Sequence, residues 1–139
     1  MINYKFEQYD STYLCYIDRD GVKFFGEAYC HPEDEDMKSE RTGYFIAETR
    51  ANISMLRYVR DHEVMPMLKY YKHFYDCVSH SSKFNKDSYE AKMLLKELRK
   101  WEKELSDIRE EIKHNRDYLR EYIDQKEKLY QKIRKGNNN

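Results

Sequence analysis

The residues best suited to chemistry lie together in one connecting segment. Cys30 and His31 are followed by Pro32 and then by four consecutive acids at positions 33–36. Thiolate, imidazole and carboxylate groups bind metal ions, and carboxylates also serve as general acids and bases. Three interpretations are therefore open: a metal site, a catalytic loop, or a polar loop that docks a partner.

The spacing of these residues argues against the first two interpretations. The acidic run lacks the spacing and the glycine of an EF-hand loop, and one histidine falls short of the ligand set of a zinc site. Neither a nucleophile with a neighbouring base nor a carboxylate pair in a pocket can be assigned. We therefore predict no metal, no cofactor and no catalytic residue, and keep a metal-dependent hydrolase at this loop as an alternative.

A second group of chemically active residues follows in the next expected helix. Three arginines recur there on one face and form a modest cationic stripe, which is either solvated or paired with the acidic loop. If the ligand were a nucleotide, these arginines and nearby tyrosines would supply phosphate contacts and stacking. The predicted ligand- or partner-binding residues are Cys30, His31, Glu33, Asp34, Asp36, Glu48, Arg50, Arg57 and Arg60.

Composition limits the classes of protein to consider. The 139 residues suit one domain, and the 21 aromatic residues (14 Tyr, 6 Phe, 1 Trp) argue against disorder although 37% of residues are charged. The net charge is zero, but residues 1–40 carry −6 and residues 81–139 carry +4. This balance lacks the basicity of a dedicated nucleic-acid binder. Three cysteines at no metal-like spacing, with no signal peptide or membrane run, predict reduced thiols in the cytoplasm.

Residues 1–31 predict a three-stranded antiparallel meander. The first strand alternates Ile2, Tyr4 and Phe6 on one face, and Asp20-Gly21 predicts a type I′ turn between the second and third strands. The two-residue turn sets Ile17 opposite Phe24. The predicted core face then carries Tyr13, Cys15, Ile17, Phe24, Ala28 and Cys30.

Two helices are expected behind this sheet, at residues 39–62 and 65–80, after an acidic loop at 32–38. An apolar stripe in the first helix is expected to cover the sheet; it consists of Ile46, Ile53, Leu56 and Val59. Pro66 predicts a break or kink near residues 62–65, because the residue before a proline is steered away from the helical region. A loop follows at 79–87.

The strongest pattern is a heptad repeat over residues 87–135, with a capping-box-like start at Asp87 and Glu90. Because the helix at 65–80 covers only about a third of this seam, the remainder predicts self-association, most simply as a dimer. A hairpin that breaks at His114-Asn115 is the alternative. The predicted oligomer seam consists of Leu94, Leu98, Trp101, Leu105, Ile108, Ile112, Asn115, Leu119, Tyr122, Leu129 and Ile133.

Together these patterns predict an α+β protein. A head at residues 1–80 contains the meander, the acidic loop and two helices, and a long coiled-coil helix at 87–135 precedes a disordered tail at 136–139.

Residues 26–51 resemble a segment of small uncharacterised proteins of phages and prophages of Gram-positive bacteria. In those proteins a Gly-x-Ala-x-Cys-His-Pro-x-Asp run leads into an Ile-Ala-Glu-x-Arg-Ala helix. The matching residues here are Gly26, Ala28, Cys30, His31, Pro32, Asp34, Gly43, Ile46, Ala47, Glu48, Arg50 and Ala51. The resemblance implies a small protein of the host-cell cytoplasm that acts by stoichiometric binding to host factors, including defence systems.

The function that we predict is therefore a non-enzymatic, oligomeric binding protein. Its partner is a host protein or a small nucleotide-like signalling ligand, and its role is that of a counter-defence inhibitor or sponge. The alternative is a nucleic-acid-binding accessory protein that uses the basic end of the last helix, residues 126–135. No membrane association is expected.

Overall fold

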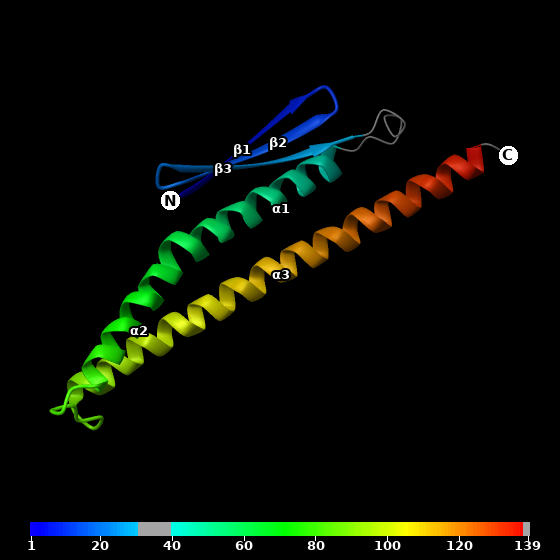
Figure 1. Cartoon of the computed structure of the whole chain (residues 1–139). Coiled ribbons are helices and arrows are strands. Elements are labelled where there is room, and N and C mark those ends of the chain that lie inside the picture. The colour runs from blue at the N-terminus through cyan, green and yellow to red at the C-terminus, as the bar shows by residue number, and fades with distance from the viewer. Residues whose placement is uncertain (31–39, 138–139) are drawn as a thin grey trace. The chain divides into compact units, whose positions relative to one another are not determined.

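The computed structural model describes residues 1–30 and 40–137 and has the expected α+β architecture. Its elements are β1 (Ile2–Tyr9), β2 (Thr12–Arg19), β3 (Val22–Tyr29), α1 (Glu40–Val59), the π-helix η2 (Arg60–Val64), α2 (Met65–Ser79) and α3 (Tyr89–Asn137) (Figure 1). The chain divides into two compact units. The first unit is Met1–Met55 with Ile112–Asn139, and the second unit is Leu56–Glu111. This division differs from the expected 1–80 head and 87–135 helix, because α3 contributes residues to both units.

The three strands form an antiparallel sheet in the order β1-β2-β3, with the predicted register. Ile17 pairs with Phe24 and Arg19 with Val22. Asp20 and Gly21 both have positive φ, 52° and 87°, as a type I′ turn requires. This turn chemistry fixes which side chains share a face of the sheet.

One face of the sheet is the core of the first unit, as predicted. Tyr13, Cys15 and Ile17 on β2 are at most 1% exposed, and Phe24 and Ala28 on β3 are buried. On β1, Tyr4 and Phe6 lie on the same face but remain 46% and 42% exposed. The expected buried face is therefore complete on β2 and β3 and open along β1.

The residues of α1 that meet the sheet are small rather than bulky. Gly43, Ala47 and Ala51 are buried and recur every four residues. A Cβ atom at Gly43 would collide with the Tyr13 ring, and one at Gly26 would collide with the backbone of Ala47 and Ala51. Glycine at these positions allows helix and strands to approach closely. The expected stripe of Ile46, Ile53, Leu56 and Val59 is only partly correct, because Leu56 and Val59 belong to the core of the second unit.

The second unit is built around Val64, Leu105 and Ile108, with Leu56, Val59, Met65, Leu68 and Trp101 packed against them. The break expected near Pro66 is instead the π-helix η2, in which the Met65 N–H donates to the Arg60 carbonyl. A proline has no N–H and its ring clashes with the preceding turn. The wider turn of a π-helix keeps the chain helical there, with Pro66 in the first turn of α2.

Helix α3 is continuous through His114 and Asn115, so the alternative hairpin does not form. Its N-cap is Ser88, whose Oγ accepts from the Ala91 N–H at 3.2 Å, and not the predicted Asp87. The helix extends to Asn137, beyond the predicted end at 135.

The single chain covers much of the α3 seam. Five seam residues are buried: Leu98, Leu105, Ile108, Ile112 and Leu119. Leu129 and Ile133 are 46% and 38% exposed. A second chain would therefore cover mainly these last two residues. The coiled coil and the dimer stay predictions.

Candidate functional site

The acidic loop lies outside the described residues. His31, Glu33, Asp34 and Asp36 all fall in the segment 31–39, so their predicted roles stay predictions. Cys30, which precedes them, is half-buried at the end of β3, and its N–H donates to the Ser11 carbonyl at 2.8 Å. Within the described residues, no group of three or more His, Cys, Asp or Glu side chains is arranged to hold a metal ion.

The predicted arginines differ in their contacts. Arg50 Nη1 donates to the Glu27 carbonyl at 2.8 Å and so joins α1 to β3. Arg57 and Arg60 belong to the second unit. There Arg60 forms a two-pronged pair with Asp61, Nε to Oδ1 at 2.8 Å and Nη2 to Oδ2 at 3.2 Å. Among the predicted binding residues that the structure describes, Glu48 lines a cavity.

That cavity is a cleft of about 780 Å³ in the first unit. It lies between β1, α1 and the part of α3 that belongs to the first unit. Its size falls in the range of small-ligand sites, roughly 300–1,000 Å³. The lining residues are Phe6, Arg41, Thr42, Tyr44, Phe45, Glu48, Tyr118, Tyr122 and Lys126. We call this cavity the aromatic cleft.

Five rings form the walls of the aromatic cleft. Phe45 on α1 lies 4.6 Å from Tyr122 and 6.0 Å from Tyr118, measured between ring centroids. Phe6 lies edge-on to Tyr44 at 5.4 Å, and Tyr44 in turn contacts the buried Tyr13 ring at 5.1 Å. Because Tyr13 is buried in the sheet core, one wall of the cleft packs against that core.

Polar contacts fix the α3 side of the cleft to α1. The Tyr122 hydroxyl donates to Thr42 Oγ1 at 3.3 Å, and Lys126 Nζ lies 5.5 Å from the centroid of the Tyr122 ring. A cation in that position is attracted by the ring face. Tyr122 therefore contacts both the Thr42 hydroxyl on α1 and the Lys126 ammonium group on α3.

The charges that line the cleft are two cations, Arg41 and Lys126, and one carboxylate, Glu48. Besides burial, the negative charge of Glu48 raises the pKa of two nearby groups, Cys15 and Tyr4. Burial, and secondly this carboxylate, raises the pKa of the Cys15 thiol to about 11. The same two causes, in the same order, raise the pKa of Tyr4. Cys15 is thus a protonated, inert core residue, as free buried cysteine usually is.

The lining of the cleft combines aromatic rings, cations and one carboxylate. Its described lining contains neither cysteine nor histidine, and its single carboxylate has no second carboxylate as partner. Rings that stack, cations that neutralise an acid and a carboxylate that accepts hydrogen bonds are means of holding a planar anion.

Sequence reasoning identified Glu48 and placed Tyr122 in the seam, but it missed the other lining residues. One available signal was the pair Tyr118 and Tyr122, four residues apart and hence on one helix face. Another was Tyr44-Phe45 beside Arg41. What no pattern indicates is that β1, α1 and α3 meet: Thr42 and Tyr122 are 80 residues apart.

No protein-family model matches the sequence, and comparisons with curated proteins and with solved structures give no significant match. None of the helices in residues 1–30 and 40–137 combines the length and apolar character needed to cross a membrane.

Proposed function

We propose that this protein is a non-enzymatic binding protein that captures a small planar anion, of the nucleotide class, in the aromatic cleft. The observation that carries the proposal is the combination of five rings with Arg41 and Lys126 around one cavity. A base that stacks on an aromatic side chain gains about 1–3 kcal/mol. Hydrogen bonds from cations to phosphate are roughly twice as strong as neutral ones.

The proposed ligand would use both ends of the cleft. Its phosphate would lie at Arg41 and Lys126, and its hydroxyl or amino groups would donate to Glu48. The ring would lie against Phe45, Tyr118 or Tyr122. The described lining contains no cysteine or histidine and no carboxylate pair, and we propose that the ligand is held and not converted.

The resemblance of residues 26–51 to phage and prophage proteins supports a biological form of the proposal. The matching segment includes Gly43, which seats α1 on the sheet, and Glu48, which lines the cleft. We propose that capture of a host signalling molecule in the host cytoplasm serves counter-defence, with the protein acting as a sponge. Blocking of a host immune protein is the other form of the same proposal.

Calorimetry with a panel of nucleotides tests the binding step. We expect the intact protein to bind at least one of them at one ligand per chain. Arg41→Ala and Lys126→Ala should each weaken binding about tenfold or more, because a hydrogen bond to a charged group contributes about 1.5–3 kcal/mol. Arg57→Ala, which removes an exposed arginine of the second unit, is the matched control and should leave the affinity unchanged.

Mass spectrometry of small molecules that co-purify with the protein completes the test. A protein that purifies without ligand and gives no heat with any nucleotide would contradict the proposal. Equal losses of affinity in Arg41→Ala and Arg57→Ala would also contradict it, because they would place the ligand outside the cleft.

We further propose that two chains associate through the exposed end of the α3 seam, Leu129 and Ile133. A nucleic-acid role is the second candidate function. The observation in its favour is that Lys128, Lys132 and Lys135 are exposed near the end of α3. Binding of this kind weakens steeply with salt, and gel shifts that show no complex at low salt would exclude it.

A further inference from the structure

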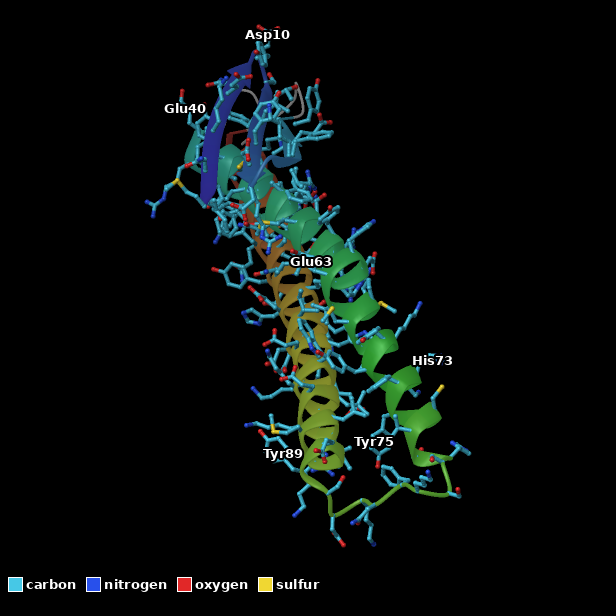
Figure 2. The ribbon with its side chains drawn as sticks, turned by 90° about the vertical axis from the view of Figure 1, so that its left-hand side faces the viewer. Asp10, Glu40, Glu63, His73, Tyr75 and Tyr89 are labelled. Carbon is cyan, nitrogen blue, oxygen red and sulfur yellow. The ribbon has the colours of Figure 1, made fainter. Side chains whose placement is uncertain are left out.

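A histidine and a cysteine approach each other on α2, away from the aromatic cleft and unused by the proposed function. His73 and Cys77 are four residues apart, so they share one face of the helix. Cys77 Sγ lies 3.6 Å from His73 Nε2. Both residues are exposed. Figure 2 shows His73 projecting outward from α2.

The separation of the two atoms is the one that a tetrahedral metal ion demands. Zinc binds nitrogen at about 2.0–2.1 Å and thiolate sulfur at about 2.3 Å. A tetrahedral angle between two bonds of those lengths places the nitrogen and the sulfur about 3.6 Å apart. The separation of the two atoms therefore matches that of two neighbouring ligands of one zinc ion. A weak thiol hydrogen bond to the imidazole accounts for the same contact in the metal-free protein.

The surroundings leave the other half of that sphere open. His80, three residues after Cys77, is the next histidine in the sequence, and its Nδ1 lies 2.5 Å from the Asp76 carbonyl oxygen. No third His, Cys, Asp or Glu of the described chain gathers at the pair. A bound ion would keep two positions for water or for a ligand from another molecule, which is the arrangement of an open site and not of a closed structural one.

We propose that His73 and Cys77 form a bidentate site for a borderline divalent ion of the Zn²⁺ class. Binding replaces the thiol proton with the metal: Cys77 releases H⁺ to solvent, Sγ and His73 Nε2 each donate one electron pair, and no electron is transferred. Thiolate and imidazole together select zinc and cobalt over magnesium and calcium, which prefer oxygen ligands. The spacing of four residues between His73 and Cys77 is visible in the sequence.

Titration of the whole, reduced protein with Co²⁺ tests this proposal. A cobalt–thiolate bond gives a charge-transfer band in the near ultraviolet, and Zn²⁺ should abolish the band by displacing cobalt. We expect saturation at one ion per chain. Cys77→Ser should remove the band, and His73→Ala should weaken binding about tenfold or more, since even indirect partners of a metal ligand are worth 10–100-fold.

Two control variants separate this site from other thiols and imidazoles. Cys30→Ser removes a half-buried cysteine of the first unit, and His80→Gln removes a histidine near the pair. Both should retain the band and the affinity. A band that persists in Cys77→Ser, or one that disappears in Cys30→Ser, would overturn the proposal. Binding seen only at millimolar cobalt and equal in all variants would overturn it as well.

Discussion

The pKa of the core residue Cys15 depends on its burial and in part on Glu48, the carboxylate that lines the aromatic cleft. It is fully buried on β2, and burial together with the Glu48 carboxylate raises its pKa to about 11. An unfolded chain would lose the same thiol proton near pH 9. Between these two values the folded protein binds more protons than the unfolded one. The stabilising contribution is therefore complete below pH 9 and is lost as the pH rises through 11.

We predict that Cys15→Ala flattens the alkaline stability profile. The free energy of unfolding of the unchanged protein should fall between pH 9 and 11 more steeply than that of the variant, because other titrating groups are common to both. Urea unfolding at several pH values measures the two slopes. Parallel profiles would show that the thiol ionises equally easily in both states, and would contradict the burial of Cys15.

At the scale of single residues, the sequence predicted more of the core than of the site. Alternation and the Asp20-Gly21 turn were enough to identify Tyr13, Cys15 and Ile17 as buried, because a two-residue turn fixes register and register fixes faces. The cleft residues follow no such rule. Arg41 and Lys126 have the pattern of ordinary surface cations until the fold brings their helices together.

At the scale of elements, the contact between α1 and the sheet depends on residues without bulk. Hydrophobic periodicity emphasises Ile46 and Ile53, whereas Gly43, Ala47 and Ala51 determine how closely the helix approaches. A stripe of small residues is hard to recognise from sequence, because glycine and alanine are also common on exposed surfaces. The π-helix η2 was equally hard to predict, because Pro66 indicates that the α-helix is interrupted but not that the interruption is a π-helix.

Gly26→Ala tests this close approach. Its new methyl group would meet the backbone of Ala47 and Ala51, which cannot rotate away. We expect a loss of about 1–3 kcal/mol or more in the free energy of unfolding. Gly43→Ala meets the buried Tyr13 ring and should also destabilise, although alanine favours a helix by about 1 kcal/mol over glycine.

Gly136→Ala is the matched control for both variants. It lies in α3 with no neighbouring atom within 4 Å of a new Cβ, so it should leave stability unchanged or raise it slightly. Thermal or urea unfolding measures all three. If Gly26→Ala were as stable as Gly136→Ala, α1 could not lie as close to β3 as the structure places it.

In the whole molecule, the heptad pattern correctly predicted the long helix α3 but did not predict which residues would bury its apolar face. A seam of apolar residues shows that a helix face is buried, but not whether the same chain or another chain buries it. In this protein Leu98, Leu105, Ile108, Ile112 and Leu119 are buried within one chain. Contacts between residues far apart in the sequence decide which chain buries the seam, and heptad spacing does not predict those contacts.

The exposed end of the seam sets how strong a dimer can be. Leu129 and Ile133 are 46% and 38% exposed in one chain, so burying the remainder gains roughly 0.6–1.4 kcal/mol for each side chain. Association itself costs an estimated ~4–15 kcal/mol. The gain from these side chains reaches only the low end of the cost, so we expect a weak dimer that dissociates on dilution. Light scattering should give a mass that rises with concentration from 17.2 kDa toward twice that value.

Leu129→Glu combined with Ile133→Glu should hold the mass at one chain at every concentration, because it places like charges at the contact. Gln131→Glu adds a negative charge at an exposed position on the helix face opposite the seam and should leave the association unchanged. A constant mass of 17.2 kDa for the unchanged protein would contradict the dimer. In that case the cover supplied by the chain itself is sufficient, and ligand capture in the aromatic cleft would be the work of a single chain.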